Sequence, residues 1–225
     1  MEFITDIFKI VSRYYPLLIG SLGITLLLTL ITVVSGVILG TLICLARDSK
    51  YKIVSLLAKA FVDIVRGTPL LLQLTFFYFA FDGANSFIRL DKFSSICLAL
   101  AINSSAYVAE IIRSGISSID KGQYEAAISL GLNKSQAMKK VILPQAIRNI
   151  LPALGNEFIS VSKETSLAST FFIGDLMTAF KTISGTTFIY LPLLTVIGII
   201  YFIITFAMGR VVSFLERKYQ TSAES

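Results

Sequence analysis

The chain has 225 residues, of which 55% are hydrophobic and 15% are charged, and its mean hydropathy is +0.78. Soluble domains carry about a quarter of charged residues, so this composition predicts an integral protein of the lipid bilayer. The sequence contains no His, which excludes His-based catalytic triads and most zinc or haem sites. Its two Cys residues lack metal-binding spacing, and we expect no metal, no resident cofactor and no catalytic residue.

Apolar runs long enough to cross ~30 Å of hydrocarbon predict an all-α, polytopic membrane protein with five spans. The second run is interrupted at Gly67-Thr68-Pro69, where the proline predicts a kink. Gly36 and Gly40, one helical turn apart in the first run, indicate a close helix contact, either within the chain or across a dimer. The spans are expected at residues 16–46, 53–81, 94–112, 150–172 and 188–208. They form a single transmembrane domain over residues 1–225.

The net charge of +6 is explained by membrane topology and needs no nucleic acid partner. With five spans, one set of loops and helix ends carries thirteen Lys and Arg residues, whereas the other carries five. Basic residues are concentrated on the cytoplasmic side of membrane proteins. We therefore expect a multi-pass protein of a prokaryotic inner or plasma membrane, with its N-terminus outside and its C-terminus in the cytoplasm.

The longest polar segment, residues 113–148, separates the third and fourth spans. Asp120 is the expected N-cap of a short helix, and Gly131 is its expected end. A second helix is expected from about Ser135 to Pro144. On periodicity alone this is a helical hairpin at the membrane surface.

Several motifs in this chain resemble those of the membrane subunits of ABC importers, in the branch for polar amino acids. The segment Glu125-Ala126-Ala127, followed by Gly131 and by Ile142-Leu143-Pro144, is similar to the EAA loop of that family. The further motifs that carry the resemblance are Arg66-Gly67-Thr68-Pro69-Leu70, residues 103–110, residues 151–158 and Lys163-Glu164-Thr165-Ser166-Leu167.

The resemblance implies that the loop docks on a separate ATP-binding subunit and transmits its movement. Glu125 offers a charge-assisted contact, the small residues Ala126 and Ala127 allow a close approach, and Gly131 and Pro144 delimit the loop. The chain has no G-x-x-x-x-G-K-[ST] phosphate-binding motif, so ATP is expected to bind to the partner. The other implied partners are a second permease subunit, identical or different, and an extracytoplasmic solute-binding protein.

Ionisable and amide side chains at membrane depth are candidates for contacts with substrate. Asn103 and Glu110 are seven residues apart and share one face of the third span, and Glu157 and Glu164 repeat this spacing in the fourth. We expect these four side chains to line a cavity. Three carboxylates there favour a basic amino acid, and glutamine, glutamate and cystine remain open.

Structural roles for these residues remain open as well. Glu110 can form an ion pair with Arg113, and Glu164 with Lys163, to fix the helix register. Asp63 and Arg66 are expected to pair along one helix face. An ion- or proton-driven amino acid carrier is the alternative class of function, although the sequence shows no inverted repeat, which that class favours.

Overall fold

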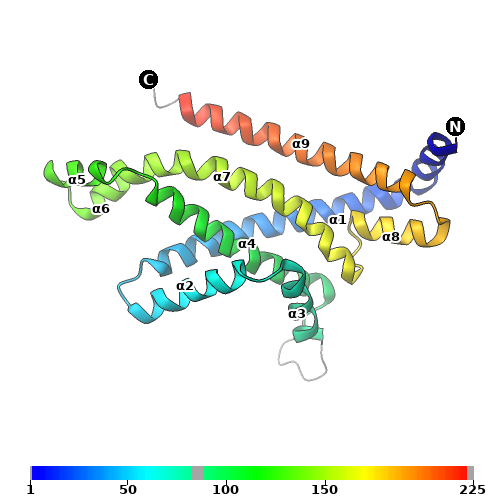
Figure 1. Ribbon diagram of the computed structural model, residues 1–225, viewed down its shortest axis with the longest axis horizontal. Helices are drawn as coiled ribbons and strands as arrows, with labels where there is room; N and C mark the ends of the chain where they lie inside the picture. Colours follow the sequence, from blue (N-terminus) through cyan, green and yellow to red (C-terminus); the bar gives the residue numbers. More distant parts are fainter. Residues whose placement is uncertain (1, 83–88, 222–225) are drawn as a thin grey trace.

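The structure is a computed structural model that describes residues 2–82 and 89–221 (Figure 1). Within those ranges every regular element is a helix, which confirms the all-α prediction. The elements are α1 (Glu2–Arg47), α2 (Lys52–Arg66), α3 (Leu70–Asp82), α4 (Lys92–Ser117), α5 (Lys121–Ser129), α6 (Lys134–Ala137), the π-helix η1 (Met138–Ile142), α7 (Leu143–Glu164), the 3-10 helix η2 (Thr165–Phe171), α8 (Leu176–Thr187) and α9 (Leu191–Thr221).

The packing of the molecule is dominated by the contact of α1 with α4. Gly36 and Gly40 face α4, where an added Cβ at Gly36 would clash with Ser104 Oγ and one at Gly40 would lie 2.7 Å from Val108 Cβ. The absence of side chains at these two positions lets the two backbones approach closely. The predicted glycine contact therefore lies within the chain.

The kink predicted at Gly67-Thr68-Pro69 is confirmed as a sharp break between α2 and α3. The two helices meet at an angle of 108°, and both pack against α4. Pro69 cannot donate a backbone hydrogen bond and restricts the conformation of Thr68, so the helix ends just before this pair.

The prediction that the second loop helix ends at Pro144 is wrong. Helix α6 continues without interruption through η1 into α7, and Pro144 occupies the first turn of α7. The π-turn before it changes the backbone hydrogen-bond register, so the missing N–H of the proline is tolerated there. The segment that follows α4 thus re-enters a long helix earlier than the sequence pattern suggested.

Membrane-spanning length and apolarity are found in three helices of the described residues, namely α1, α4 and α9. The bent pair α2–α3 makes a fourth candidate span, so the expected count of five is not confirmed. The expected span at residues 150–172 is divided between α7 and η2. Helix α7 carries the polar residues Asn149, Asn156, Glu157, Lys163 and Glu164. They explain why α7 is not among the helices apolar enough to be candidate membrane spans.

Three buried apolar clusters hold the helices together. The first joins α1 to α8 and α9, the second joins α1 to α3, α4 and η2, and the third joins the end of α1 to α2 and α4. Cys44 belongs to the third cluster, and Cys97 packs against the second. Both thiols are free and pack as small apolar side chains.

Candidate functional site

The segment between α4 and α7 presents a short helix, α5, at one end of the molecule (Figure 1). The Asp120 carboxylate accepts a hydrogen bond from the Gly122 N–H at 2.7 Å and caps α5, as the sequence predicted. Gly131 follows the helix with a φ of +86°, a conformation that glycine adopts without strain. The predicted beginning and end of α5 are therefore confirmed.

The side chains of the expected coupling motif do not all face outward. Glu125, Ala126, Gly131 and Pro144 are exposed, whereas Ala127 is 3% exposed and packs inside the chain. A pocket of about 220 Å³ separates α5 from the end of α4 and from η1, and Glu125 is among its lining residues. A carboxylate at the edge of an apolar pocket is a suitable contact for a basic group of another protein.

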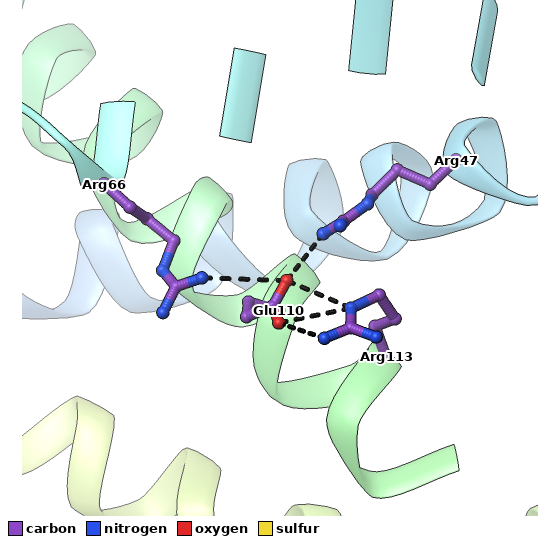
Figure 2. Close-up of polar contacts among 4 residues, drawn as sticks. All are labelled: Arg47, Arg66, Glu110 and Arg113. Carbon is purple, nitrogen blue, oxygen red and sulfur yellow. Dashed lines mark hydrogen bonds and ion pairs between the residues drawn. The ribbon is translucent and has the colours of Figure 1, made fainter. Parts of the chain in front are cut away.

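On α4, Glu110 lies at the centre of three arginines that come from three different helices (Figure 2). Its carboxylate accepts a hydrogen bond from Arg47 at 2.6 Å and further hydrogen bonds from two nitrogens of the Arg113 guanidinium. Arg66 is the loosest of the three, with its Nη1 3.7 Å from Glu110 Oε2. This cluster ties α1, α2 and α4 together.

Arg66 also connects the polar face of α4 to that of α7. Its guanidinium lies over the Tyr107 ring, 5.5 Å from the ring centroid, and it interacts electrostatically with Glu157. Among the described residues it forms an ion pair with Glu110 and none with Asp63, so the predicted Asp63–Arg66 pair is wrong. The side chain of Arg66 turns from the surface of α2 toward α4.

Glu157 and Glu164 are seven residues apart on α7, about two helical turns, and therefore lie on one side of it. Both are half-buried, and no ion pair holds either of them within the described part of the chain. Lys163 is close enough to interact with Glu164. These two carboxylates are available to a cationic ligand, whereas Glu110 is already neutralised by its arginines.

Asn103, the remaining predicted contact, lies on α4 and is 5% exposed. Its amide nitrogen donates a hydrogen bond to Gln73 Oε1 on α3 at 3.0 Å. Neither Gln73 nor Arg47 was predicted as a site residue from the sequence. The signal for Gln73 was an amide within the otherwise apolar run of α3, where a polar side chain is costly unless it has a partner.

These helices, the exposed loop helix and the polar groups between the spans define a polytopic helical permease. The family described as "Binding-protein-dependent transport system inner membrane component" matches residues 33–221, and the chain belongs to it. The resemblance seen in the sequence motifs is thereby confirmed, and the protein is a non-enzymatic membrane component of a transport system.

Relatives of this chain are permeases with names that specify amino acids. The arginine transport system permease protein ArtQ of Bacillus subtilis is 37% identical over 92% of this chain and 94% of its own length. The glutamine transport system permease protein GlnP of Escherichia coli is 36% identical over 90% of this chain and 93% of its own length.

Solved structures show the same arrangement of helices. A chain from a crystal structure of an amino acid ABC transporter with histidines has a TM-score of 0.87 and 43% identity, and the match covers 92% of this chain and 96% of that one. A chain of the MetNI methionine ABC transporter, with a TM-score of 0.72 and 16% identity, shares the fold.

Proposed function

We propose that this permease forms the membrane pathway of an ABC importer for a polar amino acid. The observation that carries the proposal is the exposed helix α5, which bears Glu125 and Ala126 and is held by the Asp120 cap and the left-handed Gly131. The arginine and glutamine relatives support an amino acid as the substrate. The uncommitted carboxylates Glu157 and Glu164 favour a basic amino acid, with glutamine, glutamate and cystine as alternatives.

In this proposal the chain works with three other kinds of protein. An ATP-binding subunit docks on Glu125, Ala126, Ala127, Gly131 and Pro144 and supplies the ATP hydrolysis. A second permease subunit completes the pathway, and a solute-binding protein delivers the amino acid from outside. The thirteen basic residues on one set of loops support a cytoplasmic position for α5 and for the C-terminus.

The proposed substrate contacts divide into two groups. Glu157 and Glu164 meet the cationic group of the substrate directly, and Asn103 adds a hydrogen bond. Glu110 takes part through Arg66, because that arginine contacts Glu110 and interacts with Glu157 as well. The geometry therefore favours Glu157 and Glu164 as the first carboxylates to test.

Uptake by cells that express the chain with its ATP-binding and solute-binding partners tests the proposed function. We expect one labelled amino acid among arginine, glutamine, glutamate and cystine to accumulate, and we expect vanadate to stop its uptake. An uncoupler that collapses the ion gradients should have little direct effect. Uptake that resists vanadate but fails with the uncoupler would instead identify an ion- or proton-driven carrier.

Glutamine substitutions test the two carboxylates on α7. Glu157→Gln and Glu164→Gln each remove a charge and keep the shape of the side chain, so we expect uptake of the identified substrate to fall about tenfold or more for a lost charged contact. Glu216→Gln on α9 is the matched control. Unchanged KM and Vmax in both α7 variants would refute their role as substrate contacts.

A further inference from the structure

Gln73 donates hydrogen bonds to backbone carbonyls at the break between α2 and α3. A helix that ends at membrane depth leaves carbonyl groups without partners, and such groups are costly in hydrocarbon. The Gln73 amide nitrogen donates to the Val65 carbonyl at 2.7 Å, to the Thr68 carbonyl at 3.2 Å and to Thr68 Oγ1 at 2.9 Å. Gln73 itself is 9% exposed.

These contacts determine which way the Gln73 amide faces. Val65 O and Thr68 O can only accept hydrogen bonds. Thr68 Oγ1 donates its own proton to the Ile64 carbonyl at 2.9 Å, so it accepts from Gln73. The nitrogen of Gln73 must therefore face the break, and its oxygen must face Asn103.

The orientation of the Asn103 amide follows from that of Gln73. An oxygen on Gln73 requires a donor opposite, so Asn103 turns its Nδ2 toward Gln73, at 3.0 Å from Oε1. Its carbonyl oxygen is then directed away from α3. In the described part of the chain this oxygen has no donor, and it is not among the fully buried polar atoms that lack a partner, so part of its surface stays accessible in the isolated chain.

We propose that Gln73 is a positioning residue that fixes the Asn103 carbonyl oxygen as a hydrogen-bond acceptor for the substrate. An acceptor that meets the side chain of the substrate selects side chains that bring an N–H donor, such as an ammonium, a guanidinium or a primary amide, and it disfavours a second carboxylate; the α-ammonium that every amino acid carries provides no such selection. The inference rests on the proposed function and narrows its substrate class to amino acids whose side chains donate hydrogen bonds.

Ligand binding to the full-length permease, purified with its ATP-binding subunit in lipid nanodiscs, tests the inference. The probes are labelled arginine, glutamine and glutamate. Gln73→Met keeps the size of the side chain but frees the Asn103 amide to rotate. We expect it to weaken binding of arginine or glutamine about tenfold and glutamate much less, so that the ratio of dissociation constants shrinks.

Two further variants separate positioning from folding. Gln73→Glu retains an oxygen toward Asn103 and adds a negative charge, so it should keep or raise the preference for arginine over glutamate even if the complex is less stable. Gln145→Met removes a comparable bond, from the Gln145 amide to the Val141 carbonyl at 2.8 Å, outside this site. It should leave the ratio unchanged.

The possible outcomes have distinct meanings. A Gln73→Met variant that discriminates like the wild type, or a Gln73→Glu variant that loses discrimination, overturns the inference. A wild-type complex that prefers glutamate also overturns it but leaves amino acid transport intact. A wild-type complex that neither binds nor transports any of the three probes or cystine refutes the proposed function itself.

Discussion

At Glu110 a single carboxylate faces three guanidinium groups, so its negative charge holds the three arginines together. Removing one member of a partly buried ionic cluster leaves the others uncompensated, which costs more than the pair contributes in isolation. The Glu110 side chain is 19% exposed and that of Arg47 is 11% exposed. Solvent screening is therefore limited between Glu110 and Arg47 and stronger at Arg66 and Arg113, which are 40% and 43% exposed. The arginines would repel one another without the carboxylate.

We expect Glu110→Gln to lower the free energy of unfolding by about 2–3 kcal/mol, measured by denaturation in detergent. Asp63→Asn, which alters an exposed carboxylate with no ion pair among the described residues, should have almost no effect. Adding Arg47→Met to Glu110→Gln should recover part of the lost stability, because it removes a cation that has lost its partner. A double variant with no recovery would contradict this account.

Asp91 provides a pH-dependent cap for α4. Its carboxylate accepts hydrogen bonds from the Ser94 hydroxyl and from the N–H groups of Ser94 and Phe93. The Ser94 bonds hold its pKa below the ordinary value of 3.8. A lowered pKa means that the cap stabilises the helix above the unfolded value and is lost as the pH falls through the folded one. We expect amide protection at the start of α4 to fall only below about pH 4, as measured by hydrogen exchange.

The relative positions of candidate site residues were predictable where the residues lie close together on one helix. The seven-residue spacing of Glu157 and Glu164 put both carboxylates on one face of α7, and Arg113 follows Glu110 by three residues. Arg47 and Glu110 are 63 residues apart, and Gln73 and Asn103 are 30 apart. Those contacts depend on how α1 and α3 pack against α4, which no single helix specifies.

Among the helix contacts, the approach of α1 to α4 gives a graded test. An added Cβ at Gly40 would come within 2.8 Å of the Ser105 carbonyl oxygen and 2.7 Å of Val108 Cβ, whereas at Gly36 it would clash with Ser104 Oγ, which can rotate, and lie 2.9 Å from Ser104 Cβ. A backbone oxygen cannot turn aside. The cost of a methyl group should therefore be higher at Gly40.

We expect Gly40→Ala to destabilise the protein by about 2–3 kcal/mol and Gly36→Ala by about 1 kcal/mol, measured by denaturation in detergent. Gly20→Ala and Gly23→Ala are the matched controls in the same helix, since nothing lies within 4 Å of an added Cβ at either position. Equal losses at Gly20 and Gly40 would contradict the packing account, because alanine has the higher helix propensity and should not destabilise an uncrowded helical position.

Sequence patterns predicted the helix ends best where a proline, a capping side chain or a glycine determines the local backbone conformation. The proline after Thr68 located the α2–α3 break, and Asp120 and Gly131 located the ends of α5. Pro144 was misread because a proline within the first turn of a helix is compatible with its continuation. Helix α8, with its buried cap Asp175, was not predicted, because its short apolar pattern is the length of a connecting segment.

At the scale of the molecule, the chain starts near α8 and ends toward the side that carries α5 and α6 (Figure 1). Together with the distribution of basic residues, this arrangement predicts that the N-terminal segment and α5 lie on opposite sides of the membrane. The prediction concerns only the sidedness of the protein and is independent of the substrate.

Cysteine labelling in spheroplasts tests this orientation. In a background without Cys44 and Cys97, an impermeant maleimide should label Ser12→Cys in intact spheroplasts and Ser129→Cys only after permeabilisation. Both positions are exposed. The reverse pattern would invert the proposed topology, and labelling of both positions in intact spheroplasts would contradict an odd number of crossings.

The unbroken course of α6, η1 and α7 has a mechanical consequence. From Lys134 to Glu164 the backbone is a single rod of roughly 45 Å, with its free end beside α5 and its far end at the two uncommitted carboxylates. A rod of this kind acts as a lever: tilting the end at α6 necessarily displaces Glu164, without any relay of intermediate contacts. The π-turn at η1 is where the helical hydrogen-bond register changes along this rod, so a substitution that alters that turn would change how a push at the loop is transmitted.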